Sequence, residues 1–317
     1  ALFDRRLSHT TDIHARPDCT TARHYGPEGA GVVTAVGNNV THVREGDHVI
    51  VSWVPRLPTK GKQIFDSSGA TYRGELVNVG SVYTWAEDIL VHNAYVVPMT
   101  KEAPKEISCV VGCAVLTGAG AVMNSAQVRP GDSVAIFGVG GVGLSALRTA
   151  AILAAYPIVA VDLDDTKLAL AQKFGATHLI NAGKVDPVEA IIEITDGGVD
   201  FAFDAIGARA TTSQIIPATR KGGSRADNRG GTAILIGLAR EEITLDPRQM
   251  LLDHRELRAS LGACCPETDF PMYLRWHQEG KFPLDQLVTR RYKLEEINEA
   301  YGALAAGEIL GRAIIEF

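Results

Sequence analysis

Residues 133–143 read SVAIFGVGGVG and decide the fold. The first five are mostly apolar and typical of a buried parallel strand, and residues 144–155 are rich in Ala and Leu, as in a helix. Between them, Gly138 permits a tight turn, Gly140 lets the backbone approach a pyrophosphate, and Gly143 allows the helix to pack on the strand. The pattern therefore predicts a strand, a turn and a helix whose first N–H groups hold a dinucleotide.

An acidic residue supports this interpretation. The apolar run PIVAVD at residues 157–162 predicts a second strand that ends at Asp162. A carboxylate about 20 residues beyond the glycine turn accepts hydrogen bonds from ribose hydroxyls. Asp164 and Asp165 follow and would repel a 2′-phosphate, so the sequence favours NAD over NADP.

Composition indicates an ordinary globular protein. The chain has 317 residues, a length that is enough for two domains with separate cores. Of these residues, 46% are hydrophobic and 21% charged, as is usual for globular proteins. The net charge of −6 argues against a nucleic acid or an anionic membrane as partner. The sequence shows no apolar run long enough to span a bilayer and opens on no secretory signal, so we expect a cytoplasmic location.

The five cysteines show no evenly spaced framework. They are Cys19, Cys109, Cys113, Cys264 and Cys265. We expect them to be thiols in a reducing compartment.

The middle of the chain alternates between strand-like and helix-like segments. Strands are predicted at residues 157–162, 178–180, 199–206 and 232–236, and helices at 166–174 and 187–194. This order predicts a doubly wound parallel sheet, the Rossmann-type α/β fold. The polar, glycine-rich residues 221–231 predict a mobile loop.

The two ends of the chain have a different pattern. Residues 30–36, 48–53 and 89–97 are short apolar runs between turn-forming residues and predict a compact antiparallel β domain. Toward the end, residues 270–278 and 294–306 predict helices, and residues 312–317 predict a last strand.

Several motifs together resemble the zinc-type alcohol dehydrogenases of the medium-chain dehydrogenase/reductase family. They are HTTDIH, EGAGVVTAVG, REGDHV, VGCAVLTGAGAV, the glycine turn and KFPLDQLVTRRYKLEEINEAYGALAAGE, and they span nearly the whole chain. The resemblance implies a GroES-like β domain over residues 1–114, a Rossmann domain over 115–262 and a C-terminal completion of the first domain over 263–317. It also implies an active site between the domains and a homodimer or homotetramer.

The opening motif carries the family's proton relay. By resemblance, His9 stands where relatives have a zinc-binding cysteine, Thr11 is the hydroxyl that exchanges the alcohol proton, Asp12 supports it, and His14 passes the proton to solvent. Without the resemblance, these residues are typical of a polar loop. Relatives have strands before this motif, so the sequence leaves open whether the stretch before Gly26 is complete.

The metal ligands follow the family only in part. The family's Gly-His-Glu is Gly26-Pro27-Glu28 here, and Cys113 matches the third ligand. The predicted catalytic zinc set is therefore His9, Cys113 and Glu28, with His24 as a substitute, and it is a degraded one. On its own, Cys113 is more typical of a buried small side chain.

A second, structural zinc is not expected. Residues 54–85, where relatives carry a lobe of four cysteines, contain none.

The resemblance also assigns the cofactor contacts. Asp162 and Lys167 lie on the adenine ribose, Ile206 and Gly207 along the adenosine, Ile236, Gly237 and Leu238 on the nicotinamide half, Arg312 on the pyrophosphate, and Gly138, Gly140, Gly141, Val142 and Gly143 form the phosphate turn.

We therefore expect an NAD-dependent oxidoreductase that transfers a hydride between the cofactor and a small alcohol or aldehyde. Two alternatives stay open. One is a zinc-independent NAD(P)H-dependent reductase of an enone, quinone or carbonyl, and the other is a dinucleotide-binding relative without catalysis.

Overall fold

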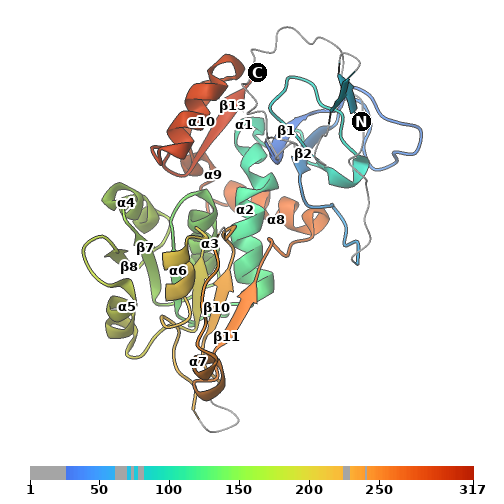
Figure 1. Cartoon of the computed structure of the whole chain (residues 1–317). Helices are drawn as coiled ribbons and strands as arrows, with labels where there is room; N and C mark the ends of the chain where they lie inside the picture. The colour runs from blue at the N-terminus through green and yellow to red at the C-terminus, as the bar shows by residue number, and fades with distance from the viewer. Residues whose placement is uncertain (1–25, 61–69, 73–74, 78–81, 224–228, 240) are drawn as a thin grey trace.

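The computed structural model describes residues 26–60, 70–72, 75–77, 82–223, 229–239 and 241–317. They form two lobes with α2 (Ala114–Gly120) running between them (Figure 1). The lower lobe in that view contains the larger sheet, and the upper one contains the β domain and the C-terminal elements.

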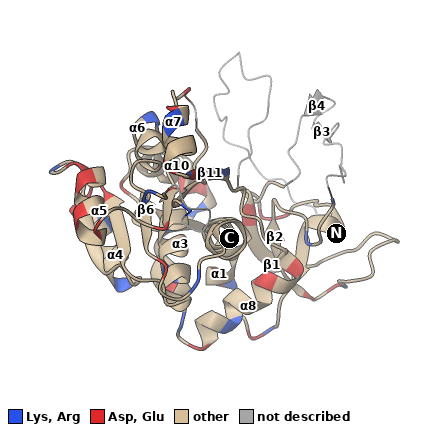
Figure 2. Ribbon diagram, turned by 90° about the horizontal axis from the view of Figure 1, so that it is seen from below, with Lys and Arg blue, Asp and Glu red and all other residues tan. Residues whose placement is uncertain are grey.

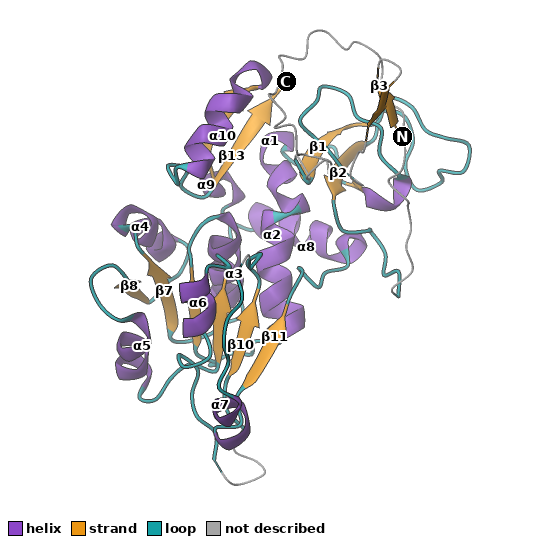
Figure 3. Ribbon diagram, in the orientation of Figure 1, coloured by secondary structure: helices purple, strands orange, loops and turns teal. Residues whose placement is uncertain are grey.

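The larger sheet is parallel throughout, with helices on both faces (Figure 3). Its strands, in order across the sheet, are β11 (Glu256–Ala259), β10 (Thr232–Leu235), β9 (Phe201–Asp204), β6 (Val134–Phe137), β7 (Ile158–Asp162) and β8 (His178–Asn181). All four residues of β6 are buried, as its apolar sequence predicts for a strand covered on two sides. The predicted Rossmann-type fold is confirmed.

The helices around this sheet are α3 (Gly141–Ile152), α4 (Asp165–Lys173), α5 (Pro187–Thr195), α6 (Arg209–Gln214) and α7 (Pro247–Leu252). Of these, α4, α5 and α7 begin at a capping aspartate. The Asp164 carboxylate accepts from Thr166 N at 2.7 Å, and that of Asp186 accepts from Val188 N at 2.8 Å. Such caps satisfy N–H groups that have no acceptor inside the helix.

The β domain is smaller and antiparallel, as predicted. It consists of β1 (Glu28–Val32), β2 (His48–Ser52) and β5 (Val96–Pro98), beside a short hairpin of β3 (Ala70–Tyr72) and β4 (Glu75–Val77). The predicted strand over 30–36 is shifted, since β1 starts at Glu28 and ends at Val32.

One predicted strand is largely wrong. Residues 93–95 form a 3₁₀ turn, η1 (Asn93–Tyr95), so only the end of the predicted strand over 89–97 is extended. The physical reason is local, because the His92 ring accepts a hydrogen bond from Ala94 N at 3.2 Å and closes the turn.

A helical crossover leads from the β domain to the sheet. It contains α1 (Lys105–Ser108), η2 (Cys109–Gly112), α2 and the π-helical η3 (Ala121–Ala126). A Cβ on Gly118 would lie 2.6 Å from Ala146 N, so glycine lets α2 pack directly on α3.

No single helix among the described residues is long and apolar enough to cross a membrane. Two consecutive helical segments, Lys105–Gly112 and Ala114–Ala126, are together long and apolar enough for a membrane span, but the chain bends by 50° between them. Val111, Val115 and Val122 of this pair are fully buried in the core.

The C-terminal elements return to the β domain. They are α8 (Pro266–Gln278), α9 (Leu284–Leu287), β12 (Val288–Lys293), η4 (Leu294–Glu296), α10 (Ile297–Ala305) and β13 (Arg312–Glu316), with β12 and β13 parallel. The first turn of α8 is acidic and its last turn is basic, which favours its helix dipole (Figure 2). β13 and β1 line the same cavity.

Candidate functional site

The glycine turn joins β6 to α3 at the carboxyl edge of the sheet, where open α/β sheets bind ligands. Gly138 has a φ of +86°, and a Cβ there would meet the Ile206 side chain at 2.8 Å. A Cβ on Gly143 would lie 2.9 Å from the Gly138 carbonyl carbon. By contrast, nothing lies within 4 Å of a Cβ on Gly140, the N-cap residue of α3. The turn therefore has two packed glycines and one with an open face, as a pyrophosphate requires.

Asp162 ends β7 next to this turn, as predicted. Its Oδ2 accepts from Val139 N at 3.0 Å, and its Oδ1 accepts from Leu163 N at 2.8 Å. These bonds fix the carboxylate at the edge of the turn, the place from which it would reach a ribose. Lys167 lies in the first turns of α4, close to Gly307.

The structure brings together two further loops that the sequence assigned to the cofactor. Gly207 and Gly237 are in backbone contact, since a Cβ on Gly237 would lie 2.8 Å from Gly207 Cα. Ile206 packs on Gly138, so the first of these loops also touches the glycine turn. Ile236 is buried and Leu238 is 78% exposed.

Arg312 begins β13 and lies against the start of α3. A Cβ on Gly141 would lie 2.8 Å from Arg312 Cγ, which places this side chain beside the turn. Its Nη2 donates to Glu28 Oε1, while its buried Nε has no partner among the described residues. Burial lowers the pKa of Arg312 to about 10, which leaves the guanidinium charged at neutral pH. The cationic side chain beside Gly141 and the open face of Gly140 fit an anionic pyrophosphate.

Glu28 uses both carboxylate oxygens within the protein. Oε1 accepts from Arg312, and Oε2 accepts from Ala114 N at 3.0 Å, at the first residue of α2. Its backbone carbonyl accepts from Thr84 Oγ1 at 2.6 Å. This predicted metal ligand therefore ties β1 to both α2 and β13.

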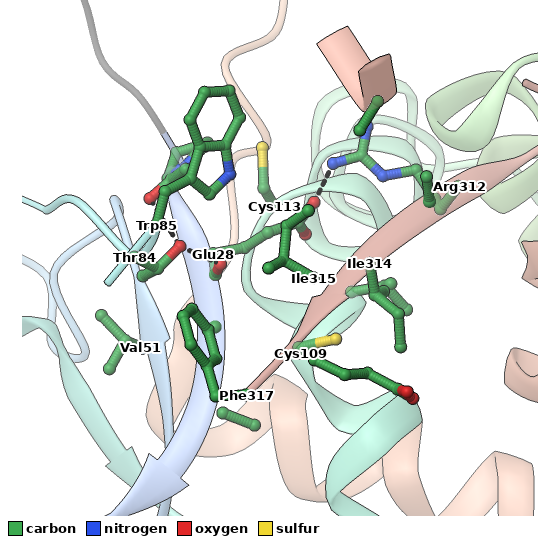
Figure 4. Close-up of a pocket in the computed structure, with 18 of the residues that line it drawn as sticks. Glu28, Val51, Thr84, Trp85, Cys109, Cys113, Arg312, Ile314, Ile315 and Phe317 are labelled. Carbon is green, nitrogen blue, oxygen red and sulfur yellow. Dashed lines mark hydrogen bonds and ion pairs between the residues drawn. The ribbon is translucent and has the colours of Figure 1, made fainter. Parts of the chain in front are cut away.

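Cys113 immediately precedes α2 and lines the same cavity as Glu28 (Figure 4). Burial raises the pKa of its thiol to about 11. The cavity has a volume of about 910 Å³, in the range of small-molecule sites. Its walls include Thr84, Trp85, Arg312, Ile314 and Phe317 (Figure 4).

The remaining predicted catalytic and metal residues are His9, Thr11, Asp12, His14 and His24, and they lie outside the described residues. Among residues that the structure describes, no three His, Cys, Asp or Glu side chains form a group that could hold a metal. Pro27 has no donor atom, and Glu28 is already engaged. The described residues alone therefore do not fit a catalytic zinc.

Sequence reasoning missed Ser52, which supports the Cys113 side of the cavity. This fully buried hydroxyl donates to Gly112 O at 2.7 Å and accepts from Val54 N at 3.1 Å. It thus links the segment before Cys113 to the end of β2, where Trp53 begins the next turn. A polar residue closing the apolar run HVIV was the only available signal.

Comparisons with known proteins agree with this geometry. Residues 8–101 match the alcohol dehydrogenase GroES-like domain, and residues 141–279 match the zinc-binding dehydrogenase family. The chain is 32% identical to an S-(hydroxymethyl)glutathione dehydrogenase of Candida maltosa, over 99% of this chain and 88% of that one.

Solved structures give the same result. An alcohol dehydrogenase zinc-binding domain protein from Burkholderia ambifaria has a TM-score of 0.81 and 36% identity, covering 91% of this chain and 82% of that one. The benzyl alcohol dehydrogenase of Acinetobacter calcoaceticus has a TM-score of 0.80 and 33% identity, with the same coverage. On the fold, the glycine turn and these matches, the chain belongs to the zinc-type alcohol dehydrogenases of the medium-chain dehydrogenase/reductase family and is an NAD-dependent oxidoreductase of that kind.

Proposed function

We propose that the protein transfers a hydride between NAD(H) and a small alcohol or its aldehyde. The observation that carries this proposal is the open face of Gly140 at the start of α3, with the cationic Arg312 side chain packed on the next residue and lining the same cavity as Cys113. Relatives named for alcohols support the substrate class.

The chain's own residues would hold the cofactor at both ends. Asp162, with Lys167 nearby, would bind the adenine ribose, and the first N–H groups of α3 with Arg312 would bind the pyrophosphate. The loops at 206–207 and 236–238 would flank the adenosine and the nicotinamide. When bound, NAD supplies the hydride acceptor or donor.

For the proton we propose the relay that the sequence predicts. Thr11 would exchange the proton of the alcohol hydroxyl, Asp12 would support it, and His14 would pass that proton to solvent. A zinc set drawn from His9, Cys113 and Glu28, with His24 as substitute, stays a prediction. To join it, Glu28 would have to leave Arg312 or Ala114. No step proposed here depends on the metal.

The direct test measures the production of reduced nicotinamide from NAD⁺ with a panel of primary alcohols. We expect turnover with NAD⁺ well above that with NADP⁺. Thr11→Val should lower kcat while leaving NADH binding unchanged, and Thr10→Val, at the neighbouring threonine, is the matched control. A protein that binds no dinucleotide, or binds it and turns over no alcohol or aldehyde, would refute the proposal.

Pro27 and the engaged Glu28 favour a second candidate, a zinc-independent reductase of an enone, quinone or carbonyl. This candidate predicts that activity with NADPH or NADH resists chelators and is unaffected by Thr11→Val. Loss of activity on chelation would exclude it.

We further propose a homodimer or homotetramer in the cytoplasm. β11 is an outer strand of the six-stranded sheet, and Leu251 and Leu252 of the preceding α7 are 75% and 61% exposed. Cys109, Cys113, Cys264 and Cys265 are free thiols, as a reducing compartment would keep them. Light scattering on the purified protein tests the oligomer.

A further inference from the structure

We propose that Asp204 is the positioning residue that sets both cofactor loops, residues 205–208 and 236–238, in their binding geometry. The inference rests on the proposed function, because those loops matter only if the protein binds a dinucleotide. Asp204 is the last residue of β9, at the carboxyl edge of the sheet, and is fully buried.

The Asp204 carboxylate accepts four hydrogen bonds. Oδ1 accepts from the backbone N–H groups of Ile206 at 2.9 Å and Gly207 at 3.0 Å, and from Thr211 Oγ1 at 3.0 Å. Oδ2 accepts from Thr212 Oγ1 at 2.6 Å. One side chain therefore fixes the backbone of the first loop and the start of α6, which follows it.

The backbone of the same residue holds the second loop. The Asp204 carbonyl accepts from Ile236 N at 2.9 Å and from Gly237 N at 2.8 Å. A Cβ on Gly207 would lie 2.7 Å from Gly237 carbonyl carbon, so the two loops touch backbone to backbone. A shift of the first loop is therefore passed directly to the second.

The glycine turn is joined to the same arrangement. Ala205 N donates to Phe137 O at 2.9 Å, and the Ile206 side chain fills the space beside Gly138. Asp204 thus lies at the point where the three segments assigned to the dinucleotide meet.

The chemistry explains why a carboxylate is needed here. Two of the four partners are backbone N–H groups, which can only donate, and an ionised carboxylate accepts from them and from both hydroxyls. An asparagine of the same shape that keeps its oxygen toward these N–H groups would turn its NH₂ group toward Thr212 Oγ1. That hydroxyl would then have to accept, and its own proton would lose its acceptor inside the core, where unmade hydrogen bonds are most costly.

The test compares graded variants with a matched control next to the same strand. Asp204→Asn keeps the shape and removes one acceptor atom, and Thr212→Val removes only the bond to Oδ2. The control is Asp200→Asn, which lies just before the amino end of β9. There Asp200 accepts from Ser133 N at 2.9 Å, Ser133 Oγ at 2.7 Å and Arg220 Nε at 2.6 Å.

We expect Asp204→Asn to weaken NADH binding by about tenfold, as the loss of one buried hydrogen bond implies, and Thr212→Val to weaken it less. The Asp200→Asn variant should bind NADH with an affinity within about twofold of wild type, even if its Tm falls as much as that of the Asp204→Asn variant. In the free protein, amide hydrogen exchange at Ile206, Gly207, Ile236 and Gly237 should speed up in the Asp204 variant only. The KM for the alcohol should change less than the KM for NAD.

The outcomes separate this inference from the proposed function. If the wild-type protein binds no dinucleotide, the proposed function fails and this inference fails with it. If wild type binds NADH and Asp204→Asn binds it as tightly, only this inference is overturned. Equal weakening by Asp200→Asn would also overturn it, because the effect would then be general destabilisation.

Discussion

Replacing Gly140 with alanine separates the two roles that the glycine turn combines. The fold should tolerate this change, because a Cβ there meets no atom within 4 Å and the residue has φ −74° and ψ −167°, which any amino acid adopts. Alanine is a poorer N-cap than glycine by a few tenths to about 1 kcal/mol, but it also lowers the entropy of the unfolded chain by about 0.4–1 kcal/mol. The two effects nearly cancel, so the free energy of unfolding should change by less than about 1 kcal/mol.

Dinucleotide binding should respond very differently. The added methyl group would occupy the open face above the first N–H groups of α3, where we place the pyrophosphate. Losing one or two hydrogen bonds from those N–H groups to a charged phosphate implies about 10- to 100-fold weaker NADH binding.

The assay pairs thermal unfolding with fluorescence titration of NADH. Gly302→Ala is the matched control, because its Cβ also meets nothing and it lies within α10, away from the turn. Gly143→Ala is the contrasting variant, since its Cβ would press on the Gly138 carbonyl and should destabilise the fold itself. If Gly140→Ala binds NADH as tightly as wild type, the pyrophosphate does not lie above Gly140 and the reasoning is wrong.

Three further predictions follow from the ion pairs and thiols. Desolvation raises the pKa of Asp200, but hydrogen bonds from Ser133 and Arg220 outweigh it, so the pKa is lower in the folded protein than in the unfolded chain. Ionised Asp200 therefore stabilises the fold above its unfolded-state pKa, and this stabilisation is lost as the pH falls through its folded-state pKa. Asp200→Asn should accordingly flatten the acid loss of stability in urea unfolding from pH 7 downward, and an unchanged pH dependence would contradict this. Arg312→Met should destabilise by about 2 kcal/mol, because it leaves the Glu28 carboxylate without its cation, and adding Glu28→Gln should restore part of the loss in the same unfolding assay. If zinc is bound, plasma mass spectrometry should find it lost in Cys113→Ala and kept in Cys109→Ala, which lines the same cavity; metal-free, active wild-type enzyme would remove the zinc.

The sheet was largely predictable because its signals are local. The buried runs that became β6, β7 and β10 are apolar throughout, and Asp164 and Asp186 cap the helices that follow in the same stretch of sequence. The first domain was harder. Its residues 89–97 are apolar enough for a strand, yet one hydrogen bond to the His92 ring closes a 3₁₀ turn within them.

The conformation of the glycine turn was predictable for the same reason, and the contacts between distant segments were not. Gly138, Gly140 and Gly143 signal their roles within six residues, whereas Glu28 finds its partner at Arg312, 284 positions further along the chain. Family spacing proposed Glu28 as a metal ligand, but no local pattern could show that both of its oxygens are used in binding β13 and α2. Asp204 was missed because a single acidic residue at a strand end resembles many others until its donors are known.

Arg312 shows how the sequence and structural assignments combine. The family pattern places it on the pyrophosphate, and the structure pairs it with Glu28. At first sight these two partners compete for one side chain. A guanidinium carries five N–H donors in a fixed plane, so one edge can bind a carboxylate while another binds a phosphate. Here Nη2 faces Glu28, and the buried Nε next to Gly141 still lacks an acceptor among the described residues. If Arg312 binds the pyrophosphate as we propose, its pairing with Glu28 orients the guanidinium for that contact, and Glu28→Gln should weaken NADH binding through Arg312. Unchanged NADH affinity in Glu28→Gln would show that the pair serves stability alone.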